Sequence, residues 1–220
     1  LGSLLQAKGD LDGAEALSRE GLEGQRETLG DRHPSTLASI NSLGSLLQAK
    51  GDLDGAEALL REAVEGHRET LGDRHPNTLA SISNLGSLLQ AKGDLDGAEA
   101  LSREALEGRR ETLGDRHPDT LSSINNLGLL LEDKGNLAGA EAQHREALEG
   151  CRETLGDRHP YTLTLINNLG LLLKAKGDLA GAEELFREAL EGTRETLGDR
   201  HPSTLTSISN LGALLQDKGD

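Results

Sequence analysis

The hexapeptide Leu-Gly-Asp-Arg-His-Pro at Leu71–Pro76 decides how the rest of this 220-residue chain is interpreted. The same six residues occur five times, and a spacing of 42 residues separates their prolines, which are Pro34, Pro76, Pro118, Pro160 and Pro202. A fixed period of this length is typical of a solenoid, in which one supersecondary unit stacks on copies of itself. A residue type that recurs with the repeat therefore does not form a cluster, and it rarely marks a catalytic site.

Each period contains two stretches with helical periodicity, as the repeat that begins at Pro76 shows. Apolar residues spaced by three and four follow this proline and predict an amphipathic helix, helix A, which ends at Gly93. Proline suits the first turn of a helix because its missing N–H is not needed there. A second helix, helix B, is predicted from Leu95 to about Leu113.

Two glycines indicate how the helices of one repeat are joined and packed. Gly114 follows helix B, and we expect it to cap that helix in the left-handed conformation. Gly86 lies in the middle of helix A, where glycine costs about 1 kcal/mol. We therefore expect helix B of the same hairpin to approach it closely. Because one hairpin cannot bury its apolar stripes alone, the sequence predicts an all-α solenoid of stacked antiparallel helix hairpins.

Composition limits the classes of protein to which this chain can belong. Its net charge of −15 is spread evenly over the repeats, whereas nucleic-acid binding needs a basic stripe, so no nucleic-acid partner is expected. No apolar run approaches the ~20 residues of a membrane span, and no membrane partner is expected. Cys151 is the one cysteine and cannot form an internal disulfide, which favours a reducing compartment and a cytoplasmic location.

The order of small and large residues within one hairpin resembles the tetratricopeptide repeat. Leu85 and Gly86 in helix A are followed in helix B by Ala98, a slot for a large side chain at Ser102, and Ala105. The ordinary repeat has about 34 residues, and the additional residues here lengthen helix B and the connection after it. This longer version is similar to the repeats of kinesin light chains and to the arrays attached to nucleotide-binding sensor ATPases.

The chain departs from the family pattern at two positions of helix B. The slot for the large side chain is occupied by Ser18, Leu60, Ser102, His144 and Phe186. The proline that ends the shorter repeat is replaced by an arginine, so we expect helix B to continue through that point. These arginines are Arg26, Arg68, Arg110, Arg152 and Arg194.

The resemblance covers the whole chain and implies a single array over residues 1–220. The array is expected to begin with part of a helix A over residues 1–8 and to continue as pairs of helix B and helix A through residue 218. Since the chain lacks an initiator methionine and opens inside a repeat, we interpret it as a piece of a longer array.

In the family that this chain resembles, the A helices line the concave inner surface of a right-handed superhelix, which binds an extended peptide or a helix. Two neighbouring positions of helix A carry asparagine, whose amide can pair with both the N–H and the C=O of a peptide backbone. The resemblance therefore implies a ladder of amides that holds the ligand. The alternative is that these asparagines cap or bridge helices within the scaffold, and both roles stay open. The residues are Asn41, Asn125 and Asn167 at the first position and Asn84, Asn126, Asn168 and Asn210 at the second.

Recognition of a particular ligand sequence needs groove positions that differ between repeats. Such differences are concentrated in the later repeats, at Leu129, Glu132, Asp133, Leu171 and Lys174. We expect these residues to contribute most of the specificity of the groove. The alternative is that these positions drifted after a recent duplication.

The histidines do not predict a metal site. Five of the seven precede the repeat prolines, so neighbouring copies are about 10 Å apart, whereas a zinc ligand lies at about 2 Å. We expect these five to stabilise the start of helix A. His144 is expected to fill the slot of its helix B, and Cys151 to be partly exposed. The sequence contains no phosphate-binding glycine loop and no nucleophile motif, so we predict no metal, no cofactor and no enzyme activity.

The sequence therefore predicts a protein–protein interaction module within a larger adaptor, scaffold or sensor protein, with a protein or peptide ligand in the groove. The competing hypothesis is structural. In it the array is a rigid spacer, or its uncapped ends stack head to tail in self-association, and the groove holds no ligand.

Overall fold

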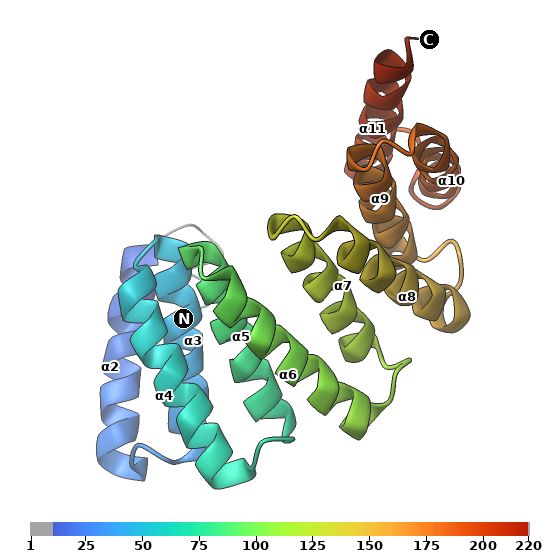
Figure 1. The fold of residues 1–220 in the computed structure, drawn as a ribbon. Helices are drawn as coiled ribbons and strands as arrows, with labels where there is room; N and C mark the ends of the chain where they lie inside the picture. The colour runs from blue at the N-terminus through green and yellow to red at the C-terminus, as the bar shows by residue number, and fades with distance from the viewer. Residues whose placement is uncertain (1–10, 220) are drawn as a thin grey trace. The chain divides into compact units, whose positions relative to one another are not determined.

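A computed structural model describes residues 11–219, and within them it shows ten α-helices joined by short turns (Figure 1). Their bounds are α2 (Leu11–Leu29), α3 (Pro34–Lys50), α4 (Leu53–Leu71), α5 (Pro76–Lys92), α6 (Leu95–Leu113), α7 (Pro118–Asp133), α8 (Leu137–Leu155), α9 (Pro160–Ala175), α10 (Leu179–Leu197) and α11 (Pro202–Lys218). The odd-numbered helices are A helices and the even-numbered ones are B helices. The partial helix A expected over residues 1–8 lies outside the described residues. None of the described helices is long and apolar enough to cross a membrane.

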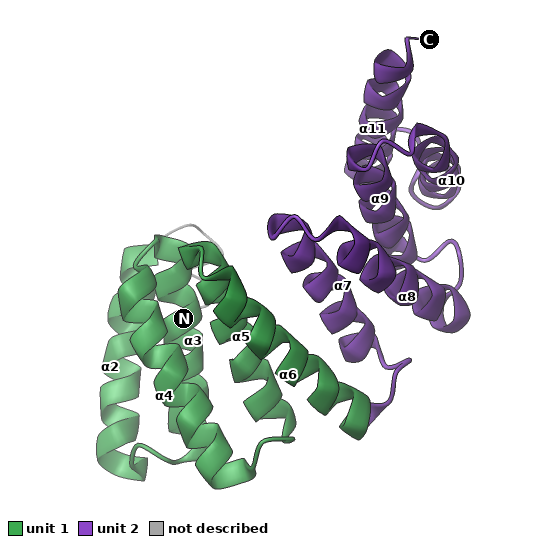
Figure 2. Ribbon diagram, in the orientation of Figure 1, with its two compact units in different colours: residues 1–112 green, residues 113–220 purple. Residues whose placement is uncertain are grey.

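Contacts divide the chain into two compact units, Leu1–Thr112 and Leu113–Asp220 (Figure 2). In unit 1, α3 packs against both α2 and α4, and α4 packs against α5. In unit 2, α9 packs against α8 and α10 in the same way, and α10 packs against α11. The helices α3 and α9 are therefore covered on both sides by B helices, as the prediction of stacked hairpins requires.

Proline and glycine set the bounds of the helices. The helix α5 begins at Pro76 and ends at Lys92, and α6 spans Leu95–Leu113, so both predicted helices are confirmed. Gly93 ends α5 in the left-handed conformation, with φ 83° and ψ 3°. Its N–H donates to the carbonyl oxygen of Gln90 at 2.9 Å, which satisfies one of the carbonyls that a helix end leaves without a partner.

In two of the repeats the glycine after helix B has a different backbone conformation from the left-handed one predicted for Gly114. Gly114 has the positive φ that a left-handed cap requires, at +87°. Its equivalents Gly72 and Gly198 combine φ 86° with ψ 165°, which is an extended mirror-image conformation rather than a left-handed helical one. The chain therefore leaves helix B in an extended direction, and glycine is needed there because it lacks a Cβ atom.

In each hairpin of the described residues, a glycine in the middle of helix A faces the slot residue of the helix B that follows it. A Cβ atom at Gly86 would lie 3.5 Å from Ser102 Oγ on α6, which confirms the predicted close approach. The contact is tighter where the slot residue is large, since a Cβ atom at Gly170 would lie 2.6 Å from a ring carbon of Phe186. His144 fills the slot of α8, as predicted, and has no exposed surface.

Charged pairs join neighbouring repeats within each unit. Helix B continues through the arginine that replaces the proline, as predicted, and Arg68 on α4 reaches Glu104 on α6 at 2.5 Å. Lys92 at the end of α5 reaches back to Glu57 on α4 at 2.6 Å, and this contact holds the pKa of the Glu57 carboxyl below its ordinary value. Equivalent pairs recur in unit 2. All are partly exposed, so solvent screens each pair and its contribution to stability is small.

The histidine before each repeat proline caps helix A. The Nδ1 atom of His75 accepts a hydrogen bond from the backbone N–H of Asn77 at 3.1 Å. This bond confirms the predicted stabilisation of the start of helix A, and it requires an unprotonated Nδ1. The same bond caps α3, α7, α9 and α11, at His33, His117, His159 and His201.

One position in the second half of helix B is buried in most of the described repeats. Cys151 occupies it in α8 and has no exposed surface, so its predicted partial exposure is wrong, and burial raises the pKa of its thiol. The physical reason is that this position faces the following A helix. His67, which occupies it in α4, shows this contact, because its Nδ1 lies 2.9 Å from Ser81 Oγ on α5. The Nε2 atom of His67 has no hydrogen-bond partner among the described residues. Burial, and secondarily the charge of His75, lowers the pKa of the His67 ring.

The variant His75→Ala should lower the free energy of unfolding by about 1 kcal/mol, because the N–H of Asn77 loses its acceptor. His75→Asn keeps an acceptor at the same position and should retain most of the stability. Urea denaturation of the parent and both variants measures the difference. Equal midpoints for the parent and His75→Ala would show that the histidine cap does not stabilise the helix.

Acidification should destabilise the fold partly through His67. In the unfolded chain this ring binds a proton near its ordinary pKa of about 6.5, whereas the folded chain binds it only at lower pH. Stability is therefore present above the unfolded pKa and is lost as the pH falls through the folded pKa. Thermal melts of the parent and His67→Gln at about pH 7 and about pH 5 measure this, and glutamine is the residue that α2 carries at this position. The parent should lose more stability than the variant, and equal losses would contradict the assignment.

Candidate functional site

Each A helix carries one stripe of side chains that its packing against the B helices leaves at least partly accessible to solvent. We call these stripes together the A-helix face, and they consist of the residues four, eight, eleven and fifteen positions after each repeat proline. Every one of these residues is exposed or half-buried. The sequence analysis found three of the four rows and missed the one nearest the proline. The missed row is Ala38, Ala80, Ser122, Thr164 and Thr206, and its signal was the recurrence of a small side chain one turn before the second asparagine position.

The two asparagine positions are hydrogen-bonded to each other across neighbouring repeats. Asn84 Nδ2 donates to Asn41 Oδ1 at 3.2 Å in unit 1. In unit 2, Asn168 Nδ2 donates to Asn125 Oδ1 at 3.4 Å, and Asn210 Nδ2 donates to Asn167 Oδ1 at 3.3 Å. The structure therefore brings the two rows together in pairs.

The two rows differ in what they leave available to a ligand. The first position faces the neighbouring repeat: Asn125 is only 7% exposed, and Asn41 and Asn167 are half-buried. The second position lies on the A-helix face. Each of its bonded amides keeps a second N–H and a carbonyl oxygen with which it can pair. Asn126 at this position is exposed, and no hydrogen bond joins its side chain to another residue of unit 2.

The five residues predicted to set specificity do not all face solvent. Leu129 and Leu171 are 40% and 45% exposed on α7 and α9, and Asp133 is also exposed. Lys174 Nζ pairs with Asp217 on α11 at 2.7 Å. Glu132 is also engaged, because its Oε1 lies 2.6 Å from Nε2 of a buried histidine on α8. The exposed apolar surface of this patch therefore comes from the two leucines.

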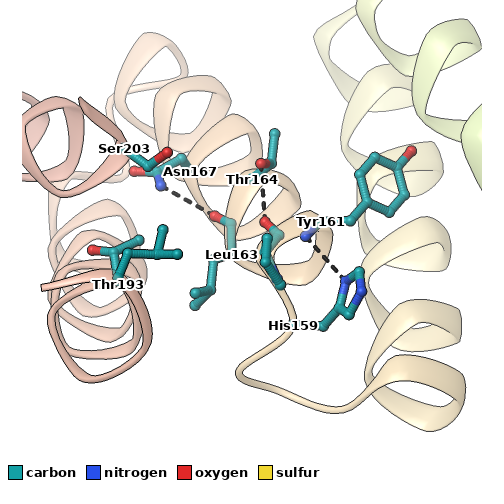
Figure 3. A pocket seen from close by; sticks show the side chains of 9 residues that line it. His159, Tyr161, Leu163, Thr164, Asn167, Thr193 and Ser203 are labelled. Carbon is teal, nitrogen blue, oxygen red and sulfur yellow. Dashed lines mark hydrogen bonds between the residues drawn. The ribbon is translucent and has the colours of Figure 1, made fainter. Parts of the chain in front are cut away.

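A pocket of about 340 Å³ opens in unit 2 where α9, α10 and α11 meet (Figure 3). Its apolar lining includes Leu163 and Leu197, and Thr164 connects it to the A-helix face. Asn167 lines the pocket as well, where its amide donates to the carbonyl oxygen of Leu163 at 3.1 Å and to Ser207 Oγ at 3.2 Å. The pocket therefore combines apolar walls with one amide whose orientation is fixed.

A short side chain in helix B leaves room for this pocket. Thr193 on α10 lies on its wall and turns its hydroxyl back to the carbonyl oxygen of Ala189 at 2.9 Å. At the equivalent position of α4, His67 instead reaches the next A helix at Ser81. The sequence analysis missed the pocket because it depends on side chains of three helices from two repeats.

The chemistry that the A-helix face offers is hydrogen bonding by amides and burial of apolar groups. Among the described residues, no group of three or more histidine, cysteine or acidic side chains could hold a metal ion.

Comparisons with known proteins agree with this architecture. The sequence profile of the tetratricopeptide repeat matches residues 1–69, 36–111, 79–153, 121–195 and 161–220. No curated protein matches the chain. Among solved structures, BtubC (BKLC) from P. vanneervenii is 26% identical with a TM-score of 0.82, over 96% of this chain and 85% of that chain. A kinesin-light-chain-like protein of Podospora anserina with nearly identical TPR-like repeats is 28% identical with a TM-score of 0.80, over 89% of this chain and 93% of that one.

The variants Asn168→Ala and Asn126→Ala should differ in stability by about 1 kcal/mol. Both variants replace an asparagine in helix A by alanine and so gain the same helix propensity, but within unit 2 only Asn168→Ala removes a hydrogen bond between repeats. Urea denaturation of the two proteins measures the difference. If both variants were equally stable, the bond between the asparagines would not contribute to holding the repeats together.

Proposed function

The chain belongs to the tetratricopeptide-repeat family, and we propose that its A-helix face binds an extended peptide or a helical segment of a protein partner. Tetratricopeptide repeats generally mediate protein–protein interactions and are typically non-catalytic. In this proposal the chain is the interaction module of a larger adaptor, scaffold or sensor protein and forms one array over residues 1–220.

The observation that carries the proposal is the fixed orientation of the amides in the second asparagine row. Each bond to the preceding repeat holds one amide in place before a ligand arrives. The remaining N–H and carbonyl oxygen can then pair with the backbone of a ligand at little cost in side-chain entropy. In the proposal the same asparagines have both roles, because the contact that supports the scaffold also orients the amide for a ligand.

Apolar contacts on unit 2 would select the ligand. Leu129 and Leu171 give the A-helix face two exposed apolar side chains. The pocket beside Thr164 has the walls to take a branched aliphatic side chain, with Asn167 next to it for a polar atom of the same residue. A ligand with aliphatic residues in register with these features fits the surface by burying apolar area.

One observation favours the alternative of head-to-tail self-association. Leu205 and Ile208 on α11 are 51% and 38% exposed, whereas their equivalents Leu79 and Ile82 on α5 are buried. An apolar face of this kind associates with another helix when one is available. Light scattering over a range of protein concentrations tests this alternative. If the particle mass increases with protein concentration, and Leu205→Glu abolishes this increase, self-association is supported. A monomer mass that stays constant over the concentration range would exclude it.

Peptide-library capture on the parent chain tests the proposed function, with Asn126→Ala as the principal variant. Asn126 is exposed and has no hydrogen-bond partner to lose within unit 2, so its replacement should leave the melting temperature of the protein unchanged and reduce capture about fivefold, as the loss of one hydrogen bond predicts. A second variant changes Asn84, Asn126, Asn168 and Asn210 together to alanine and is compared at a temperature that matches its stability. Equal capture by the parent and both variants, or capture by none, would contradict the proposal.

The pocket gives a second prediction. Thr193→His should place an imidazole in the pocket, because His67 at the equivalent position of α4 extends toward the next A helix. It should weaken the binding of captured peptides by about tenfold, since an aliphatic side chain loses its site. The matched control is Leu185→Ala, which changes the same helix at a position outside this pocket. Peptide titrations followed by calorimetry measure both. Unchanged affinity in Thr193→His would show that the pocket takes no part in binding.

A further inference from the structure

Three of the pockets among the described residues lie along the B helices and repeat with the period of the sequence. In unit 1, a pocket of about 350 Å³ opens where α2, α3 and α4 meet, and one of about 280 Å³ opens where α4, α5 and α6 meet. A pocket of about 410 Å³ opens in unit 2 between α8, α9 and α10. We call these the B-helix pockets. The same seven positions of the repeat line all three, and none of these positions belongs to the A-helix face.

Each B-helix pocket has an apolar floor made by three side chains from three helices. In the pocket of α4, α5 and α6 these side chains are Val64, Leu85 and Leu101. The first two are buried, and Leu101 on the next helix B is half-buried. The equivalent floor in unit 2 consists of Leu148, Leu169 and Leu185. Such a floor can cover the methylene groups of a ligand side chain.

The arginines on the rim of the pocket are engaged within the protein. Arg61 pairs with Glu57, one turn earlier on α4, at 2.8 Å. Arg68 pairs with Glu104 on α6 at 2.5 Å. Equivalent pairs hold both arginines of the pocket in unit 2. Because each guanidinium group is compensated by a carboxylate, the rim carries no excess positive charge that would favour an anion.

One carboxylate on the rim is not engaged in this way. Glu69 pairs with Arg32 of the preceding repeat at 2.7 Å, but no hydrogen bond or ion pair joins Glu65 to another residue of unit 1. Glu65 is exposed and lies one turn before Glu69 on α4. In unit 2, likewise, Glu153 is paired, whereas Glu149 is exposed and has no ion pair inside the unit. These two pockets therefore combine an apolar floor with one available carboxylate.

We propose that the B-helix pockets bind a basic segment of a partner protein, with the aliphatic stem of a lysine or arginine side chain on the apolar floor and its charged group at the available glutamate. A side chain with an apolar stem and a cationic end matches both parts of the pocket. The net charge of −15 adds a long-range attraction for a basic partner. This inference goes beyond the proposed function, because the A-helix face takes no part in it.

The spacing of the pockets indicates which basic segment fits. The two pockets of unit 1 belong to α2 and α4, which are consecutive B helices, so the pockets lie roughly 10 Å apart by the ordinary distance between packed helices. Residues seven positions apart lie on one face of an α-helix and are also separated by about 10 Å. A helical segment with basic residues at every seventh position therefore reaches both pockets of unit 1.

A chemical-shift titration of the whole chain tests the inference. The probe is a helical peptide of alanine and glutamine with lysine at every seventh position, and the control peptide has norleucine at those positions. The methyl signals of Val64 and Leu101 should shift with the lysine peptide, whereas those of Leu129 and Leu171 on the A-helix face should stay constant. The control peptide should bind about fivefold more weakly, because it lacks the ion pairs at two pockets. Equal or tighter binding of the control peptide would overturn the role of the carboxylate.

Two variants separate the carboxylate from the floor. Glu65→Gln removes a charge without breaking an ion pair of unit 1, so it should leave the melting temperature unchanged and weaken binding at the Val64 signal about threefold. Leu101→Gln copies Gln143, the residue that α8 carries at this position, and should weaken binding about fivefold, because the floor loses an apolar wall. The matched control is Glu184→Gln, which makes the same change of charge at an exposed residue of α10 outside the B-helix pockets.

The pocket of unit 2 serves as a control within the same molecule. The dissociation constant measured at the Leu148 signal should be the same in the parent, Glu65→Gln and Leu101→Gln. If Glu184→Gln weakened binding at Val64 as much as Glu65→Gln does, net charge alone would account for the effect, and the assignment would be overturned. Shifts confined to Leu129 and Leu171, or no shift of Val64 and Leu101 at millimolar peptide, would overturn it as well. Failure of the peptide-library capture would contradict only the proposed function, because these methyl signals test the B-helix pockets independently.

Discussion

The close contact between a glycine in helix A and the slot residue of helix B is the constraint on which each repeat depends. Where the slot holds a large residue, as at Phe186, any side chain at the facing glycine would collide with it. The two helices can pack only at the distance that this pair allows, and that distance fixes which residues of helix A turn outward. The glycine costs helix propensity, which the burial of the slot residue offsets. The A-helix face is therefore set by a contact on the opposite side of the same helix.

Neighbouring repeats are held by contacts that are individually weak. The charged pairs are partly exposed, and the hydrogen bonds between asparagines are of ordinary strength. Because a solenoid is stable only through contacts between neighbours, a polar residue that bridges two repeats has a structural role even when it also lies on a binding surface. Asn84 illustrates this: its bond to Asn41 uses one N–H and leaves the rest of the amide on the surface. The two roles that the sequence left open for the asparagines are compatible in this geometry.

Much of the fold could be predicted from the sequence because proline and glycine recur at fixed places. The bounds of α5 and α6 followed from Pro76, Gly93 and Gly114, since these residues act within a few positions of themselves. The failures concern contacts between helices that are distant in sequence. The burial of Cys151 depends on the following A helix, which periodicity within one helix B does not reveal. The pocket beside Thr193 requires three helices, and the contact of Glu132 with His144 joins two helices of a hairpin at a distance that only packing determines.

Variation between nearly identical repeats has its largest effects at buried positions. On the exposed rows of helix A, one polar residue replaces another with little change in the backbone. Beneath them, Thr193 lines a pocket, whereas His67 at the equivalent position of α4 contacts Ser81 on the next helix. His144 makes hydrogen bonds to Asn125 and Glu132 that a phenylalanine in the same slot cannot make. In the proposed function, substitutions in the slots and at the junctions between repeats can therefore change the selectivity of the array while the surface amides stay in place. The residues that distinguish one ligand from another need not touch it in that function, because a buried side chain sets the space beside the surface groups that do.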